Sequence, residues 1–276
     1  MNLSQIKKYL KNLFYKIIKK EPHFKKTYIS NASEVLKNID ENKAMKLIIG
    51  GEFEAIGKLE YYLLLSEGLK KNHVIVDVGC GSGRLALQLV DFLEGKFIGI
   101  DIVPKLVNYA RKSCNRPDWV FKTAAGLTIP AKDESVDFIS FFSVFTHLTH
   151  EEIYKYLIDS KRVLKVDGKI IFSFLEFSMP SHWSFFENYV NDPNPNKVLN
   201  HLISRDAIKA MSEHLDLKIE SIIDGTELHI PLPEPVKFEN GHVFKDFGAL
   251  GQSVCVLTKL QLSSESNTED SAKTNS

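Results

Sequence analysis

The sequence contains few cysteines and no long apolar run. Its 276 residues include three cysteines, Cys80, Cys114 and Cys255, and no two of them form a Cys-x-x-Cys pair. A disulfide framework or a zinc site is therefore not expected, and a reducing compartment is favoured. No apolar run approaches the roughly 18 residues that a membrane-spanning helix needs, and the N-terminal stretch lacks the apolar core of a signal peptide. These absences indicate a cytoplasmic protein.

Other signatures are missing as well. We find no internal repeat with a period of roughly 20–50 residues and no Ser-His-Asp signature. No two-histidine-plus-carboxylate group occurs at metal-binding spacing, so we expect no required metal. The charges balance at 35 Lys and Arg against 35 Asp and Glu, and 43% of the residues are hydrophobic. This composition predicts one folded domain with additions.

The balanced total hides a basic N-terminal segment. Residues 1–26 contain eight lysines and one acid, Glu21, which leaves the rest of the chain with 27 of the 35 basic and 34 of the 35 acidic residues. The segment has apolar residues at the spacing of an amphipathic helix, namely Leu3, Ile6, Leu10, Leu13 and Ile17. Such a helix either lies on the domain or contacts an anionic membrane or a partner through residues 1–20. In the second case the protein is peripheral at the inner membrane face.

We divide the chain into three parts. Residues 1–50 are expected to form the basic helix and a helical lid, and residues 51–261 the main domain. Within the domain, 177–203 and 225–250 are aromatic or rich in turn residues, so we interpret them as irregular insertions on the substrate side. Residues 262–276 have almost no apolar residues, which predicts a disordered tail.

Strands and helices alternate in the main domain. Strands are predicted at 74–78, 97–101, 119–123, 136–142 and 169–176. Helices are predicted between or after them at 82–93, 104–114 and 150–164. Alternation of this kind indicates a doubly wound α/β fold with a mostly parallel sheet and helices on both faces. Two closing strands, 217–224 and 253–260, are joined by a loop without a helix and should pair antiparallel. We therefore predict seven strands with an antiparallel last strand at one end, preceded by a helical extension that includes 33–46 and 54–69.

A glycine-rich turn follows the first predicted strand. It reads GCGSGR from Gly79, and such a turn brings backbone N–H groups close to a ligand. Arg84 stands where a dinucleotide-binding turn needs its last glycine, and Asp77 would repel a pyrophosphate but attract an ammonium group. Asp101 ends the second strand, where an acid commonly accepts hydrogen bonds from ribose hydroxyls. The site thus predicts a ligand with a ribose and an ammonium group.

Three stretches together resemble one family. "VDVGCGSGRLALQL", "FIGIDIVPKLVNYA" and "IPAKDESVDFISFFSVFTHL" resemble the class I S-adenosylmethionine-dependent methyltransferases, in particular their bacterial small-molecule and glycan branch. The resemblance covers about 74–176. It implies that S-adenosylmethionine is the cofactor, that Asp77 faces its ammonium group, that Asp101 binds both ribose hydroxyls and that Ile102 packs on the adenine. It also implies that the turn lines the methionine and ribose parts through Gly79, Cys80, Gly81 and Gly83.

Two further cofactor contacts follow from the resemblance. Ser143, at the end of the fourth strand, should lie near the methionine chain. The family often has an acid after the third strand, but this chain has none at 123–126. We therefore expect backbone groups around Ala125 and Gly126 to recognise the adenine.

The candidate catalytic residue is His147. It lies between the fourth strand and a capping box formed by Thr149 and Glu152, where it could act as a general base for a hydroxyl acceptor. It could also only orient a loop or pack against the cofactor. His150 falls in the first turn of the next helix, where we expect it to be exposed.

Three functions are open at this point. The first is O-methylation of a sugar or glycan, possibly lipid-linked, with the aromatic insertion as a lid or a stacking platform. The second is methylation of a soluble metabolite or a lipid at O, N or C. The third is a binding module for S-adenosylmethionine without turnover. No nucleic-acid partner is expected, because the main domain is acidic, and the oligomeric state is left open.

Overall fold

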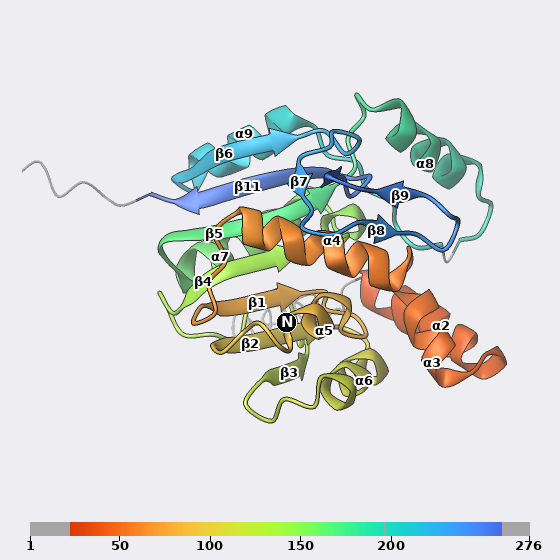
Figure 1. Ribbon diagram of the computed structural model, residues 1–276. Coiled ribbons are helices and arrows are strands. Elements are labelled where there is room, and N and C mark those ends of the chain that lie inside the picture. Colours follow the sequence, from red (N-terminus) through yellow and green to blue (C-terminus); the bar gives the residue numbers. More distant parts are fainter. Residues whose placement is uncertain (1–22, 196, 261–276) are drawn as a thin grey trace, which may run out of the picture.

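The protein is built around one seven-stranded sheet. The computed structural model describes residues 23–195 and 197–260, and Figure 1 shows the strands side by side. The order is β3 (Val120–Thr123), β2 (Lys96–Asp101), β1 (Val74–Val78), β4 (Val136–Phe141), β5 (Leu164–Phe174), β11 (Ser253–Lys259) and β6 (Leu217–Ile223). The predicted α/β fold class is confirmed.

The antiparallel strand lies one place inside the edge of the sheet. β11 is inserted between β5 and β6 and is antiparallel to both, with Cys255 opposite Phe172 on one side and Ile222 on the other. The pairing of the two closing strands was predicted, but the position of β11 was not, because we expected it at the end of the sheet. Insertion leaves β6 as the edge strand.

Helices cover both faces of the sheet. Side chains of α4 (Phe53–Ser66), α5 (Arg84–Leu89) and α6 (Pro104–Cys114) share one apolar cluster with alternate strand residues such as Ile75 and Phe97. Side chains of α7 (His150–Val163) and α9 (Arg205–His214) share the other cluster. None of the helices in the described ranges is both long and apolar enough to span a bilayer.

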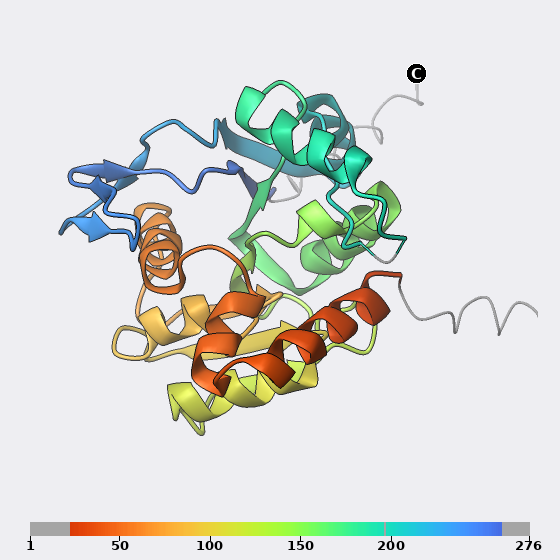
Figure 2. The same cartoon turned by 90° about the vertical axis from the view of Figure 1, so that its right-hand side faces the viewer.

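The N-terminal extension contains a break that the sequence did not predict. One helix was expected over 33–46, but α2 (His23–Asn38) and α3 (Glu41–Ile48) meet at Asp40. The Asp40 carboxylate accepts hydrogen bonds from the N–H groups of Asn42 and Lys43, so it caps α3 and ends the continuous helix. Both helices lie at the edge where the parallel strands end (Figure 2). The predicted helix in residues 1–20 and the predicted tail lie outside the described residues.

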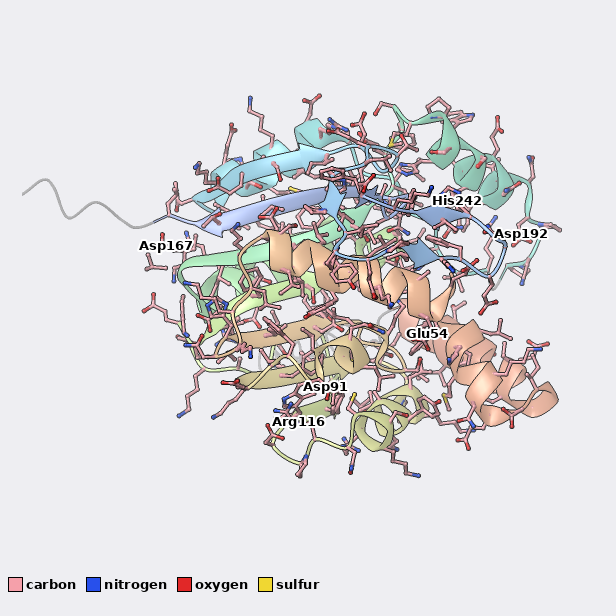
Figure 3. All side chains as sticks on the ribbon, in the orientation of Figure 1. Glu54, Asp91, Arg116, Asp167, Asp192 and His242 are labelled. Carbon is pink, nitrogen blue, oxygen red and sulfur yellow. The ribbon has the colours of Figure 1, made fainter. Side chains whose placement is uncertain are left out.

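The two insertions are more regular than expected. Segment 177–203 contains α8 (Pro180–Asn191), in which Pro180 occupies the first turn, where a helix tolerates proline. The 225–250 segment pairs β7 (Ile230–Pro231) with β10 (Phe247–Gly248) and β8 (Val236–Lys237) with β9 (Val243–Phe244). Both segments lie at the carboxyl ends of the strands; Figure 3 shows Asp192 and His242 on that side and Asp167 on the opposite side.

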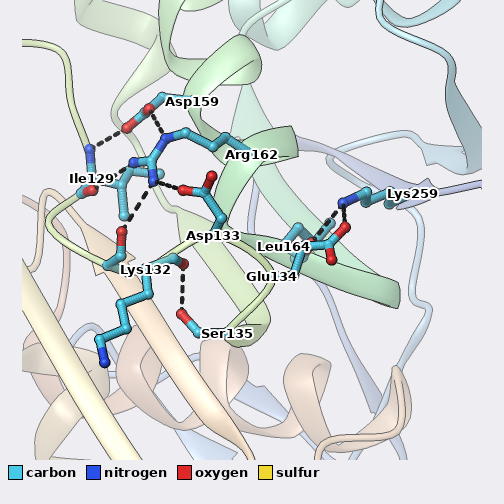
Figure 4. A network of polar contacts seen from close by, with 10 residues as sticks. Ile129, Lys132, Asp133, Glu134, Ser135, Asp159, Arg162, Leu164 and Lys259 are labelled. Carbon is cyan, nitrogen blue, oxygen red and sulfur yellow. Dashed lines mark hydrogen bonds and ion pairs between the residues drawn. The ribbon is translucent and has the colours of Figure 1, made fainter.

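One arginine anchors the connection between β3 and β4. Arg162, in the last turn of α7, donates to the carboxylates of Asp159 at 2.7 Å and Asp133 at 2.5 Å. It also donates to the carbonyl oxygens of Ala131 and Ile129, both at 3.1 Å (Figure 4). These contacts hold the connection against α7.

Candidate active site

A cavity lies at the carboxyl ends of β1, β2 and β4. The empty space in and above it is about 1010 Å³, which includes space open to solvent. The strand ends and the glycine turn form its floor. Tyr28 from α2 and Ile48 and Ile49 from α3 and its C-cap line it from the N-terminal extension.

The glycine turn gives the cavity a close-packed edge. Gly79 and Gly81 have φ angles of +78° and +53°. A Cβ atom would lie 2.3 Å from Val144 Cγ2 at Gly79 and 2.5 Å from Ile49 Cγ2 at Gly81. These positions therefore need glycine for both conformation and space.

The N–H groups of this turn are bonded within the protein. Those of Gly79 and Cys80 donate to the carbonyl oxygen of Ile100 at 2.7 and 3.0 Å. That of Gly81 donates to Asp101 at 3.0 Å. Gly79, Cys80 and Gly81 nevertheless line the cavity, so the expectation that the turn borders the ligand stays a prediction, and the glycines also allow the close packing of apolar side chains.

Asp77 is a buried carboxylate at the end of β1. Ser140 Oγ donates to its Oδ1 at 2.7 Å, and in the part of the chain that the structure describes no cation is paired with it. Burial raises the pKa of Asp77 to about 8, against the opposing effect of the Ser140 hydrogen bond. A ligand ammonium group at this point would supply the missing positive charge.

Asp101 ends β2 on the other side of the turn. Its two carboxylate oxygens accept the N–H groups of Gly81 at 3.0 Å and Val103 at 2.8 Å. Burial raises the pKa of Asp101 to about 6, although these backbone hydrogen bonds lower it. A carboxylate offers about four acceptor sites, so two remain for the hydroxyls of a ribose. The two acids thus fit the ammonium and ribose groups of S-adenosylmethionine.

His147 lies in a short 3-10 helix, Phe145–His147, and lines the same cavity. Its Nδ1 is 2.7 Å from the carbonyl oxygen of Leu199; because a carbonyl only accepts, Nδ1 carries the hydrogen and Nε2 has the free lone pair. The Tyr28 ring packs edge-on against the imidazole, with centroids 5.1 Å apart. Burial lowers the pKa of His147, which keeps the ring neutral near pH 7.

A polar cluster supports the cavity wall at Ser143, whose φ is +58°. The Ser143 N–H donates to Ser173 Oγ at 2.7 Å. Both serine hydroxyls donate to Gln252 Oε1, at 3.3 Å from Ser143 and 2.7 Å from Ser173. Ser143 was predicted, whereas Gln252, from the segment that follows β10, was missed.

A buried ion pair also lines the cavity and was missed. Arg84 Nε donates to Glu60 Oε2 at 3.2 Å, and Arg84 Nη2 donates to Glu60 Oε1. Arg84 Nη1 donates to the carbonyl oxygen of Gly50 at 3.1 Å and so ties the N-terminal extension to the glycine turn. Burial raises the pKa of Glu60, against the opposing effect of the guanidinium. In the sequence, the one sign of this ion pair was Arg84, which stands where a dinucleotide-binding turn has its last glycine.

The remaining predicted residues divide into two groups. Cys80 and Ile102 line the cavity, whereas Gly83, Ala125 and Gly126 do not. At Gly83 an added Cβ would lie 3.1 Å from Ala110, between α5 and α6, and the lining residue after β3 is Ala124. His150 is exposed, as expected, and its ring packs against His201 at 4.5 Å between centroids. Within residues 23–195 and 197–260, no three His, Cys, Asp or Glu side chains gather in a metal-binding arrangement.

Known proteins resemble this chain both in sequence and in fold. The family model described as "Methyltransferase domain" matches residues 76–172. The demethylmenaquinone methyltransferase of Tropheryma whipplei is 31% identical over 175 residues, which are 63% of this chain and 69% of that protein. A Methanosarcina mazei S-adenosylmethionine-dependent methyltransferase superposes with a TM-score of 0.53 at 16% identity, over 71% of this chain and 97% of that chain.

A second solved structure contains a bound product. The magnesium protoporphyrin IX methyltransferase of Synechocystis, with bound S-adenosylhomocysteine, superposes with a TM-score of 0.56 at 13% identity, over 85% of this chain and 97% of that chain. At these identities the structural likeness concerns the fold alone.

Proposed function

This chain belongs to the class I S-adenosylmethionine-dependent methyltransferases, and we propose that it methylates a hydroxyl oxygen of a sugar or glycan. The cofactor supplies a methyl group on a sulfonium, which is already activated for displacement. The residues around the cavity therefore have to position the two reactants and remove the hydroxyl proton.

We assign the cofactor to the β1–β2 side of the cavity. Asp77 pairs with the ammonium group, Asp101 binds the ribose hydroxyls, and Ile102 packs on the adenine. The turn residues that line the cavity and Ser143 border the methionine chain, and Ala124, the lining residue after β3, borders the adenine. The charge-unpaired Asp77 carboxylate and the two open acceptor sites on Asp101 support this assignment.

The tautomer and the neutral charge of His147 are the main support for an oxygen acceptor. Its Nδ1–H is held by Leu199, so its neutral Nε2 lone pair is available to take a hydroxyl proton. Leu199 belongs to the same insertion as α8, so the segment that we assign to acceptor binding also orients the proposed base.

A second acceptor class is supported by the cavity wall. Ile48, Ile49, Leu106 and Val144 make much of the lining apolar, which suits a metabolite or a lipid methylated at O, N or C. A demethylmenaquinone methyltransferase and sterol 24-C-methyltransferases are among the sequence relatives. A binding module without turnover is the third candidate, and the neutral His147 in the cavity argues against it.

Calorimetry with two ligands tests the cofactor assignment. S-adenosylhomocysteine has an amino-acid end, whereas 5′-methylthioadenosine lacks it but keeps the adenosine. Asp101→Asn should weaken both ligands by about 10-fold to 100-fold, since it removes charged hydrogen bonds. Asp77→Asn should weaken only S-adenosylhomocysteine. Asp91→Asn, at an exposed site, is the control; equal affinities in all variants would contradict the assignment.

A methyl-transfer screen tests the acceptor. Labelled S-adenosylmethionine is offered with nucleotide sugars, lipid-linked glycans and small metabolites. With an oxygen acceptor, His147→Ala should lower kcat by about 100-fold or more while the affinity for S-adenosylhomocysteine stays within about 2-fold. Full turnover by this variant would remove the role of His147 as a base, and methylation of metabolites alone would favour the second acceptor class.

A further inference from the structure

Exposed apolar side chains gather at the edge that carries the cavity. The structure gives thirteen large hydrophobic residues as exposed within its described ranges, and nine of them belong to the N-terminal extension or the two insertions. We call these nine the apolar rim: Ile39, Leu47, Phe177, Trp183, Phe185, Val190, Leu228, Val243 and Phe247. Figures 1 and 2 show the elements that carry them around the carboxyl ends of the strands.

The densest part of the rim lies on α8. This helix buries one side chain, His182. Trp183, Phe185 and Val190 are 42%, 49% and 60% exposed. Trp183 packs on Phe186 with ring centroids 5.0 Å apart, so the aromatic surface is held together while it faces outward. A helix with such a face lacks an apolar partner within the described chain.

The chain that follows α8 reaches the residues around His147. After α8 the chain continues to Leu199, whose carbonyl oxygen holds His147, and to His201, whose N–H donates to the Thr146 carbonyl at 2.7 Å. Ile39 lies just before α3 and Leu47 lies in its last turn, next to Ile48 and Ile49, which line the cavity. An apolar phase in contact with the rim would therefore lie at the mouth of the cavity.

We infer that the apolar rim docks on the surface of an anionic lipid bilayer and that the acceptor is presented there on a lipid. This inference rests on the proposed function and names the carrier of its acceptor. Three separate segments contribute to the rim, and a bilayer surface can contact all three at once. Trp and Phe side chains are favoured at the interface between headgroups and acyl chains.

The charge distribution along the sequence favours an anionic bilayer. Residues 1–26 hold eight lysines and one acid, whereas the rest of the chain has 27 basic and 34 acidic residues. The acidic body alone would be repelled by anionic headgroups. The lysine-rich segment leads directly into α2, which lies at the same edge as the rim (Figure 2). The same chain thus carries lysines that attract anionic lipids and, on the rim, aromatic side chains that insert.

The two tryptophans allow a direct test with the whole chain. Trp119 is 5% exposed and lies in the core, whereas Trp183 is 42% exposed on the rim. Vesicles of equal parts phosphatidylglycerol and phosphatidylcholine are added, with and without brominated acyl chains. Docking should shift the Trp183 emission to shorter wavelength, and the brominated lipid should quench it. Trp183→Phe, which leaves Trp119 alone, should show neither effect.

Matched variants test whether vesicle binding depends on the rim or on exposed apolar side chains in general. Phe185→Ser with Val190→Ser should weaken vesicle binding by about 10-fold or more, with the affinity for S-adenosylhomocysteine unchanged. Ile158→Ser, at a 47% exposed site on α7 outside the rim, should bind vesicles like the natural chain. Replacing the six lysines between residues 7 and 20 by Gln should also weaken binding to anionic vesicles.

Specific outcomes would overturn the inference. Vesicle binding that depends on the lysines but not on Phe185 and Val190 would exclude the rim. A change in Trp183 emission with a soluble glycan and none with vesicles would make α8 an acceptor platform in solution. A rim-dependent dimer without vesicle binding would assign the surface to a second copy. Calorimetry reports separately on the proposed function, because S-adenosylhomocysteine binding does not need the rim.

Discussion

On the side of the cavity that we assign to the cofactor, hydrogen bonds of 2.7–3.0 Å hold two acids and a glycine turn at adjacent strand ends. In the segment that we assign to the acceptor side, α8 buries one side chain, His182. The cofactor side is a packed part of the sheet, in which an added methyl group would collide with a neighbour. The acceptor side exposes most of its helix to solvent. The difference indicates that substitutions on the cofactor side lower the free energy of unfolding strongly. Substitutions on the exposed surface of α8 should lower it little.

His182, the buried side chain of α8, forms a hydrogen bond through each of its ring nitrogens. His182 is fully buried, and its Nδ1 accepts the N–H of Glu176 at 3.0 Å while its Nε2–H donates to the carbonyl oxygen of Gly251 at 2.9 Å. Glu176 in turn accepts hydrogen bonds from Arg205 at 2.8 Å and from Ser253. A hydrogen-bond network thus joins α8, α9 and β11, and most of the remaining side chains of α8 are exposed.

The largest effect on stability should come from the ion pair on the cofactor side. Glu60→Ala leaves the Arg84 guanidinium buried without its carboxylate, so the free energy of unfolding should fall by about 3–5 kcal/mol in denaturant titrations. Glu54→Ala, on the same helix, removes an exposed ion pair with Lys46 and should have little effect. Equal losses in both variants would remove the distinction between buried and exposed pairs here.

A smaller loss should follow from one methyl group in the glycine turn. Gly79→Ala adds a Cβ atom 2.3 Å from Val144 at a φ of +78°, and it should cost about 2–4 kcal/mol in thermal or chemical unfolding. Gly68→Ala places the same atom in open space at a φ of +92°. Gly68→Ala should lower the free energy of unfolding only by the backbone strain, about 1 kcal/mol. The difference between the two variants then measures the steric clash of the added Cβ atom with Val144 at position 79.

The third effect depends on pH. The folded protein holds the Asp77 proton up to about pH 8, whereas an unfolded chain releases it near pH 3.8. Between these values the folded state binds more protons, so the stability of the ligand-free protein should fall as the pH rises. Asp101, with a pKa of about 6, adds to the fall in the lower part of this window.

Asp77→Asn removes the main source of this dependence. At pH 8 the variant should be more stable than the natural chain by about 1–3 kcal/mol, although it binds S-adenosylhomocysteine more weakly. Unfolding titrations at pH 5 and pH 8 check the prediction. A natural chain that gains stability between these pH values would contradict the burial argument for Asp77.

The smallest effect should come from the acceptor side. Phe185 is 49% exposed on α8, so Phe185→Ser should change the free energy of unfolding by less than about 0.5 kcal/mol. A loss of 2 kcal/mol or more would mean that the helix is part of the folding core, and the contrast between the two sides would fail.

The sequence brought the residues at this end of the sheet together because their signals are local. Asp77, the glycines and Asp101 directly follow or end apolar strand runs, and parallel strands bring their carboxyl ends together. Glu60 and Tyr28 could not be placed in the same way, because they reach the cavity from helices whose packing angle no local pattern gives. The bonding of the turn N–H groups to Ile100 and Asp101 is also a tertiary feature.

The acceptor side was predicted less well for a different reason. Prolines at 180, 193 and 195 favoured an irregular segment, yet the first lies in the opening turn of α8 and the other two follow its end. The apolar periodicity did not indicate a helix either, because α8 exposes aromatic residues and buries a histidine. The break at Asp40 had a similar cause, because a capping side chain ended a helix that propensity alone would continue.

The insertion of β11 between β5 and β6 has a consequence for synthesis of the chain. In the described sheet β6 pairs only with β11, and β5 pairs with β11 on the side away from β4. Chains emerge from the ribosome N-terminus first at about 5–20 residues per second, so β6 waits roughly 2–6 s for its partner. A nascent chain that ends before residue 253 therefore exposes two unpaired strand edges, the state in which chaperone binding competes with aggregation.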